Sequence, residues 1–308
     1  MPNDSCYFYL APHISMKKFL LLIFILPLML QGQSYVDVLS AYYQYSAGDK
    51  PPSDKYQDVF IEMVSVSLNV PVKVDSDYVI LNPTYENLEM VFPGSYPDRR
   101  FHILYLPITW LHSWKAGKMK TAFGFIPRIS STLNNTIRTR DFQYEAYVLN
   151  ILKKSETLNL KFGVYYNTQY FRLLVIPLLG ADWTINNRWS LFGVLPGSMN
   201  LDYKFSKHIH SGFQFRSITN NYQTIGNYFI RVNDYQLKLY TDYYLTKRNV
   251  LNFQVGHTVF RKFRYGYRDT GLPEYVPMNI TGGWIFKIGY SFRITTEVAR
   301  TEPPSLAD

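Results

Sequence analysis

The chain has 308 residues, a formal net charge of +9 and an aromatic content of 17%. Apolar residues make up 47% of it, which excludes a disordered chain and means that a large apolar surface must be placed somewhere. Its single cysteine, Cys6, precedes the apparent export signal. We therefore expect a mature chain without a disulfide, a thiol nucleophile, a cysteine metal site or a lipidated cysteine.

The first predicted element is a secretory signal peptide. Lys17 and Lys18 follow Met16, and the twelve-residue apolar run 19–30 then leads into a polar stretch. This order is typical of a cleaved signal, and the run is shorter than the roughly 20 residues of a spanning helix. We expect three parts: an upstream extension and signal peptide at 1–33 with Met16 as the start, a barrel at 34–294, and a flexible tail at 295–308.

Alternation of apolar and polar residues dominates the chain from Tyr35 to Ile294. In the stretch 158–164, apolar residues occupy every second position, and asparagine, lysine and glycine lie between them. A period of two is typical of strands with one apolar and one polar face. Such segments lie at 36–46, 58–72, 77–90, 100–112, 118–129, 142–152, 158–164, 172–184, 188–195, 199–205, 208–218, 227–245 (one long strand or two), 251–259 and 284–294.

The segments indicate one all-β domain, an antiparallel barrel of about 12 strands within a range of 12 to 14. An even number is expected because an antiparallel barrel with both termini on the periplasmic side needs one. Connections at Asn186-Asn187 and Lys207-His208 are short, whereas those at 48–56, 91–99 and 262–279 are longer. Short turns on one rim and long loops on the other are typical of outer-membrane barrels.

The apolar face is expected to meet lipid. Beyond the signal no apolar run reaches about 18 residues, so a helical membrane protein is excluded and only strands could span. A dozen strands enclose an interior too wide for side chains to fill, so an apolar lumen would be unstable. The tryptophans fall near predicted strand ends, as in aromatic girdles. A soluble periplasmic ligand-binding barrel stays open as an alternative.

A resemblance adds to this interpretation. The run WSLFGVLP at 189–196, followed by DYKF at 202–205 and GFQF at 212–215, resembles uncharacterised outer-membrane β-barrel families of unknown function. The segment GYSFRI at 289–294 is similar to the aromatic last strand that the barrel-assembly machinery recognises. The resemblance implies a barrel in the bacterial outer membrane and that machinery as a partner, but it supplies no catalytic residues.

Few residues suggest enzymatic chemistry. The sequence contains no G-x-S-x-G, phosphate-binding loop, H-E-x-x-H or dinucleotide fingerprint, so no catalytic residue, metal or cofactor is assigned. His208 and His210 could meet Asp202 and Lys204 on a neighbouring strand, but a metal site would need a third firm ligand. Ser211 or Ser217 with His257, as in outer-membrane hydrolases, and the carboxylates Glu86, Glu89 and Glu145 are weaker candidates, better explained as lumen or loop residues.

Charge gives the remaining functional bias. Basic pairs and clusters at 99–100, 153–154, 247–248 and 261–264 lie near strand ends, where outer-membrane lipids and lipopolysaccharide would be partners, whereas nucleic acid would not. Lumen charge candidates are Lys118, Lys120, Lys161, Lys204, Arg216, Lys238, Lys287 and Arg293. They outnumber the acids assigned to the same faces, Asp37, Glu145, Asp202 and Asp242. We expect a passive pore with a mild anion preference, or a structural or binding platform; a lipid-modifying enzyme or hydrolase is the alternative.

Overall fold

A computed structural model of the chain describes residues 35–48, 59–91, 100–114, 117–133, 137–167, 174–224, 226–267, 274–278 and 282–295. The signal peptide and upstream extension expected at 1–33 and nearly all of the tail expected at 295–308 lie outside these residues. In the described part of the chain, no helix is long and apolar enough to cross a membrane. The described residues include the 3-10 turn Thr139–Asp141.

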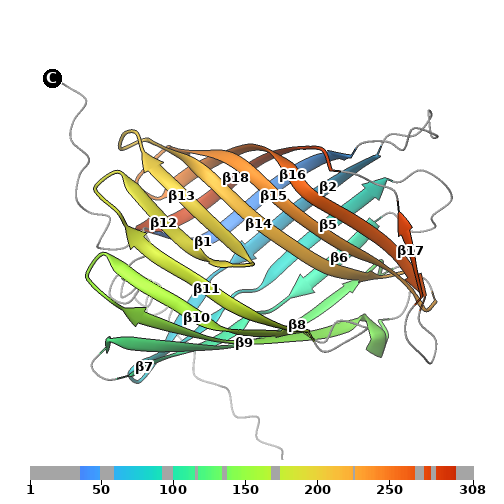
Figure 1. Cartoon of the computed structure of the whole chain (residues 1–308), viewed down its shortest axis with the longest axis horizontal. Helices are drawn as coiled ribbons and strands as arrows, with labels where there is room; N and C mark the ends of the chain where they lie inside the picture. Colours follow the sequence, from blue (N-terminus) through green and yellow to red (C-terminus); the bar gives the residue numbers. More distant parts are fainter. Residues whose placement is uncertain are drawn as a thin grey trace, which may run out of the picture.

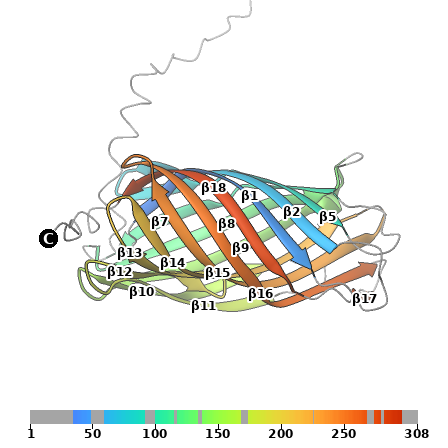
Figure 2. The same ribbon diagram turned by 90° about the horizontal axis from the view of Figure 1, so that it is seen from above.

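Antiparallel strands form a single closed sheet (Figures 1 and 2). The ring closes where β1 pairs with both β2 and β18. The strands are β1 (Tyr35–Gly48), β2 (Val59–Leu68), β3 (Val70–Val74), β4 (Asp77–Leu81), β5 (Thr84–Val91), β6 (Arg100–Tyr105), β7 (Ile108–Trp114), β8 (Met119–Ser131), β9 (Phe142–Lys153), β10 (Leu158–Asn167), β11 (Leu174–Thr184), β12 (Trp189–Leu195), β13 (Ser198–Lys204), β14 (Ile209–Gln223), β15 (Tyr228–Tyr244), β16 (Asn249–Tyr267), β17 (Glu274–Met278) and β18 (Trp284–Thr295).

The barrel has fourteen spans rather than the twelve expected first. Four spans consist of two strands in line, namely β2 with β3, β4 with β5, β6 with β7, and β17 with β18. The expected segments coincide with these spans, and 227–245 is one long strand, β15. Fourteen is the upper end of the expected range, and each of the fourteen expected segments, including those of the short β12 and β13, forms one span.

The two ends of the barrel differ. Tyr35 pairs with Thr295, so the first and last strands begin and end on one rim. Connections of two to four residues join β3–β4, β7–β8, β9–β10, β11–β12, β13–β14 and β15–β16 on that rim, which we call the turn end (left in Figure 1). The opposite rim, the loop end, was expected to carry a loop at 262–279. Residues 262–267 of that segment instead extend β16, and residues 274–278 form β17.

Outward and inward faces alternate along each strand. On β15, Leu237 and Leu239 are 49% and 45% exposed, whereas Lys238 between them is fully buried. The same relation holds on β8, where Phe123 and Phe125 are exposed and Arg128 is buried. The barrel therefore turns its apolar residues outward and its polar residues inward, which is the arrangement of a wall that spans lipid.

An apolar cluster lies inside the barrel at the loop end. Its members come from β2, β5, β6, β14, β15, β16 and β17 and include the fully buried rings Phe101 and Phe263. Here Gln223, at the end of β14, pairs with Ser131 of β8. Since β9 to β13 lie between β8 and β14 in the sheet order, this pairing closes a smaller ring at the loop end, with the cluster inside it.

Candidate functional site

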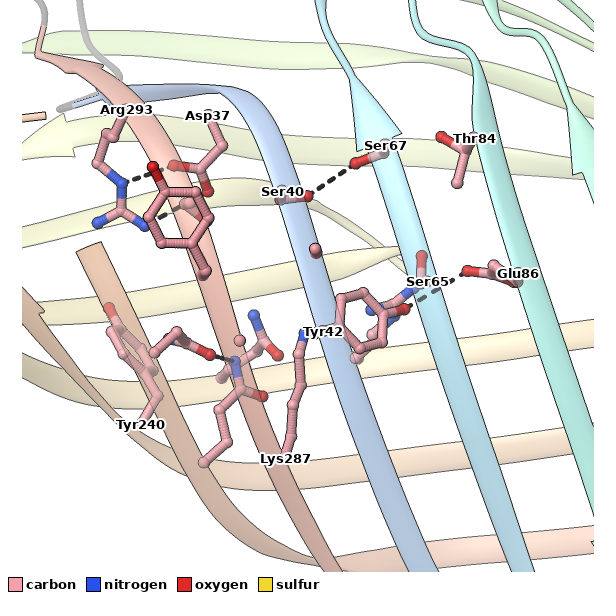
Figure 3. Close-up of a pocket in the computed structure, with 18 of the residues that line it drawn as sticks. Asp37, Ser40, Tyr42, Ser65, Ser67, Thr84, Glu86, Tyr240, Lys287 and Arg293 are labelled. Atoms are coloured by element: carbon pink, nitrogen blue, oxygen red, sulfur yellow. Dashed lines mark hydrogen bonds and ion pairs between the residues drawn. The ribbon is translucent and has the colours of Figure 1, made fainter. Parts of the chain in front are cut away.

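A polar cavity of about 270 Å³ lies inside the barrel (Figure 3). We call it the central cavity. Its walls come from β1, β2, β5, β6, β13, β14, β15, β16 and β18. The charged residues that line it are Asp37, Glu86, Arg216, Lys287 and Arg293. Hydroxyl and amide side chains such as Ser65, Thr84, Asn200 and Gln214 make up much of the rest, so the cavity suits water and polar solutes.

Arg293 is held rigidly toward the turn end of this cavity. Its Nε donates to Asp37 Oδ1 at 2.7 Å and its Nη1 donates to Asp242 Oδ2 at 2.6 Å. Tyr244 Oη accepts a further bond at 3.0 Å. The guanidinium lies 3.5 Å from the centre of the Tyr35 ring. Because two carboxylates and a ring fix it, Arg293 acts first as a cross-link between β1, β15 and β18.

Two further basic residues line the middle of the cavity, and a third is buried beside them. Lys287 places its ammonium 3.6 Å from the centre of the Tyr42 ring, and Arg216 lines the same space. Lys238 lies fully buried beside them, and its Nζ has no hydrogen-bond partner among the described residues. Glu86 is the neighbouring acid and accepts hydrogen bonds from Tyr42 at 3.4 Å and Tyr105 at 3.2 Å. This part of the interior therefore presents more basic than acidic groups.

A second cavity, of about 330 Å³, lies beneath β14. We call it the side cavity. It shares Glu86, Tyr105 and Arg216 with the central cavity, so the two adjoin. Its walls also come from β8, β9, β10 and β11 and from the turn Pro196-Gly197. Polar residues such as Arg128 and Glu145 lie beside apolar ones such as Ile176 and Leu178.

The eight lumen charge candidates occupy different environments. Arg216, Lys287 and Arg293 line the central cavity, and Lys204 and Lys238 are buried on inward positions of β13 and β15. Lys161 is paired with Asp182, with 2.6 Å between Nζ and Oδ1. Lys120 is half-buried near the turn end of β8. Lys118 lies on the exposed connection between β7 and β8, away from both cavities.

Several interior charges were missed or misplaced by the sequence analysis. Arg261, grouped there with the basic strand ends, is buried and bonds to Asp234 through Nε at 3.1 Å and Nη2 at 2.9 Å. A bulge of one residue on β16, at Val259, moves Arg261 to the inner face. Asp182 and Arg128 also lie inside. These additions are two bases and two acids, Asp234 included, so they leave the basic excess of the lumen unchanged.

The candidate enzymatic and metal residues do not converge. His208 Nδ1 lies 3.1 Å from the Tyr244 carbonyl, and His210 Nδ1 lies 3.6 Å from Asp202 Oδ2. His257 Nδ1 lies 2.8 Å from the Thr258 carbonyl. Ser211 donates to the Tyr240 carbonyl, and Glu89 pairs with Arg100. Across the described residues, no group of three His, Cys, Asp or Glu could hold a metal ion.

Comparison with known sequences and structures finds one family model and several solved structures similar to this chain. A family model described as Domain of unknown function (DUF6268) matches residues 118–272. The chain is similar to the crystal structure of an outer membrane channel from Pseudomonas putida F1, with a TM-score of 0.44, 10% identity, and coverage of 85% of this chain and 96% of that one. It is also similar to the NanC porin, with a TM-score of 0.40, 8% identity, and coverage of 83% of this chain and 100% of that one. A third similar structure is the TodX monoaromatic hydrocarbon channel, with a TM-score of 0.41, 10% identity, and coverage of 83% of this chain and 89% of that one. No curated protein matches the sequence.

Proposed function

Because the chain belongs to the family described as Domain of unknown function (DUF6268), whose description carries no activity, we propose a function from its own geometry. The protein is an outer-membrane barrel through which small polar solutes pass. The observation that carries this proposal is the polar central cavity, enclosed by a wall whose outer face is apolar. A wet interior inside a lipid-facing wall is the arrangement of a passive pore.

The basic groups around the central cavity give the proposed pore a preference. Arg216 and Lys287 line a region in which Glu86 is the neighbouring acid. Fixed cations in a confined aqueous path concentrate anions. The pairs Lys161–Asp182 and Arg261–Asp234 neutralise part of the charge elsewhere in the lumen. The expected preference for anions is therefore mild.

The barrel surface supports an outer-membrane location. Exposed aromatic residues occur at or near strand ends, among them Trp114, Trp183 and Trp284, where ring and polar edge suit the headgroup layer. Basic residues at the rims, such as Lys153 and Arg100, would meet anionic lipids and lipopolysaccharide. Assembly through the barrel-assembly machinery, by way of the last strand β18, belongs to the same proposal.

Conductance in a planar lipid bilayer tests the proposal directly. The detergent-folded protein should migrate differently on gels before and after heating, and it should insert and conduct ions. Absence of conductance from correctly folded protein would replace the pore with the second candidate, a structural or binding platform. Recovery of the protein as a soluble monomer without detergent would reject the membrane barrel itself, in favour of a soluble ligand-binding barrel.

A further inference from the structure

The side cavity lies where the wall of the barrel is incomplete. The hairpin of β12 and β13 ends at Pro196-Gly197, because proline offers no backbone donor and the pair favours a turn. β11 pairs with β12 only from Leu179 onward, and β14 pairs with β13 only as far as Arg216. Residues 174–178 of β11 and 218–222 of β14 therefore have no partner strand on this side among the described ladders. Figure 1 shows this separation of β14 from β11 beyond the hairpin.

The axial route through the barrel narrows at the loop end. The apolar cluster that contains Phe101, Tyr222 and Phe263 lies inside the smaller ring closed by β8 and β14. The side cavity lies below that ring and adjoins the central cavity through Glu86, Tyr105 and Arg216. The space that leads away from the central cavity toward the loop end thus turns sideways, between β11 and β14.

The residues that line the side cavity change from charged near the central cavity to apolar near the incomplete wall. Ile176, Leu178, Pro196 and Ile218 belong to the edges that border the incomplete wall. The charged residues of the cavity lie on the inner faces of β5, β8, β9 and β14. A ligand that fits both parts has an apolar body and a polar head, and a cavity of about 330 Å³ suits a small molecule.

Arg128 identifies the chemistry of the head. Its side chain is 8% exposed, and its Nη1 donates to Glu145 Oε1 at 3.0 Å and to Asn220 Oδ1 at 3.1 Å. Nε and Nη2, on the other edge of the guanidinium, are buried and have no hydrogen-bond partner among the described residues. Buried donors without partners are costly, and this edge matches the two oxygens of a carboxylate.

We propose that the side cavity binds a carboxylate attached to a small apolar body, with the head on Arg128 and the body between β11 and β14. This proposal gives the substrate class of the proposed pore. Only the claim that the ligand is transported rests on the proposed function, because binding to the site can be measured separately. Glu86 and Glu145 nearby favour a singly charged head over a doubly charged phosphate. The exchange route would then open toward the apolar layer of the membrane.

Isothermal titration of the protein in lipid nanodiscs tests the site, with octanoate as the probe and octanamide as its neutral analogue. The wild type should bind one octanoate saturably, and octanamide about tenfold or more weaker. Arg128→Lys keeps the positive charge but loses the paired N–H donors of the guanidinium, and it should weaken octanoate binding by about tenfold. Arg188→Gln, at the turn between β11 and β12, is the matched control and should bind like the wild type.

Three outcomes would overturn the site: octanoate uptake that does not saturate, equal binding of octanamide, or an Arg128→Lys variant that folds and binds like the wild type. The comparison of the two probes needs no variant, so it remains decisive if Arg128→Lys does not fold. Conductance without octanoate binding would reject the site and leave the pore. Binding without conductance would support the site and reject the pore.

The sideways route has its own test. Ile218→Trp places a large ring at the incomplete wall, whereas Ile209→Trp changes an exposed residue near the turn end of the same strand. Octanoate should associate more slowly with the first variant than with the second, as measured by stopped-flow displacement of a fluorescent carboxylate. Equal association rates would overturn the route.

Discussion

The ring of Tyr35 on β1 meets the ring of Phe192 on β12 edge to face, with 5.5 Å between their centroids. β1 and β12 lie nearly opposite each other in the fourteen-span ring. The contact therefore crosses the lumen near the turn end. Since Arg293 also lies on the Tyr35 ring, this point is a constriction between the turn end and the central cavity.

Removal of the Tyr35 ring should widen this constriction. Tyr35→Ala is expected to raise single-channel conductance severalfold, because a ring that spans the lumen is replaced by a methyl group. Tyr35→Phe keeps the ring and should conduct like the wild type. Single-channel recordings in planar bilayers provide the measurement, and equal conductance for all three proteins would show that ions do not pass between Tyr35 and Phe192.

Selectivity should depend on the cations of the central cavity. Reversal potentials under a salt gradient are expected to show a mild anion preference that weakens as ionic strength rises and screens the lumen. Arg216→Gln combined with Lys287→Gln should shift the reversal potential toward cations. Lys118→Gln, on the exposed connection, is the control and should leave it unchanged. Cation preference in the wild type would refute the assignment of basic charge to the lumen.

Loss of one partner of a buried ion pair should destabilise the barrel. Arg261 bonds to Asp234 and, through Nη2, to Ser46 Oγ at 2.7 Å, so it joins β16, β15 and β1. Arg261→Ala leaves Asp234 buried without its cation, a change that costs about 3–5 kcal/mol. Urea titration of the protein in vesicles measures the free energy of unfolding. Lys247→Ala, at the exposed turn between β15 and β16, is the control and should change it by less than about 1 kcal/mol.

Alternation in the sequence was enough to predict the strands and their faces, because a lipid-facing wall imposes a period of two on each span. It failed where the surroundings change along one strand. The expected segment 208–218 ends where β14 becomes polar on both faces, yet the strand continues to Gln223. There Asn221 is buried, and its carbonyl accepts a bond from Gln143 of β9.

The functional residues were less accessible to sequence reasoning. The parity of Arg261 depends on the bulge at Val259, which no local pattern marks. Arg128 occupies an inward position of β8. Its proposed binding role depends on a hydrogen bond that orients its guanidinium toward Asn220, which is 92 positions away in the chain. Contacts across the lumen depend on the closure of the ring, so neither the constriction nor the side cavity could be inferred from alternation.

We expect that the histidines have no catalytic role. Substitution of His208, His210 and His257 together by glutamine should leave the barrel folded. His208 and His257 bond to backbone carbonyls and belong to no interior ion pair with Arg or Lys, and His210 Nδ1 lies 3.6 Å from Asp202 Oδ2, too far for a hydrogen bond. The wild type should show no lipase, acyltransferase or protease activity in assays with detergent-dispersed substrates. An activity in the wild type that the triple variant loses would make the protein an enzyme.

Charged substitutions on the outer face distinguish lipid from water as its surroundings. Leu239 lies on the outer face in the middle of β15, and Phe205 lies outward beside the turn that follows β13. Leu239→Arg should lower the free energy of unfolding by about 2–4 kcal/mol if that face meets the bilayer midplane, and Phe205→Arg, near the headgroups, by about 0–1 kcal/mol. Urea titration in vesicles compares the two. In a soluble barrel both positions would face water, so two equally small effects would contradict the lipid-facing wall on which the proposed pore depends.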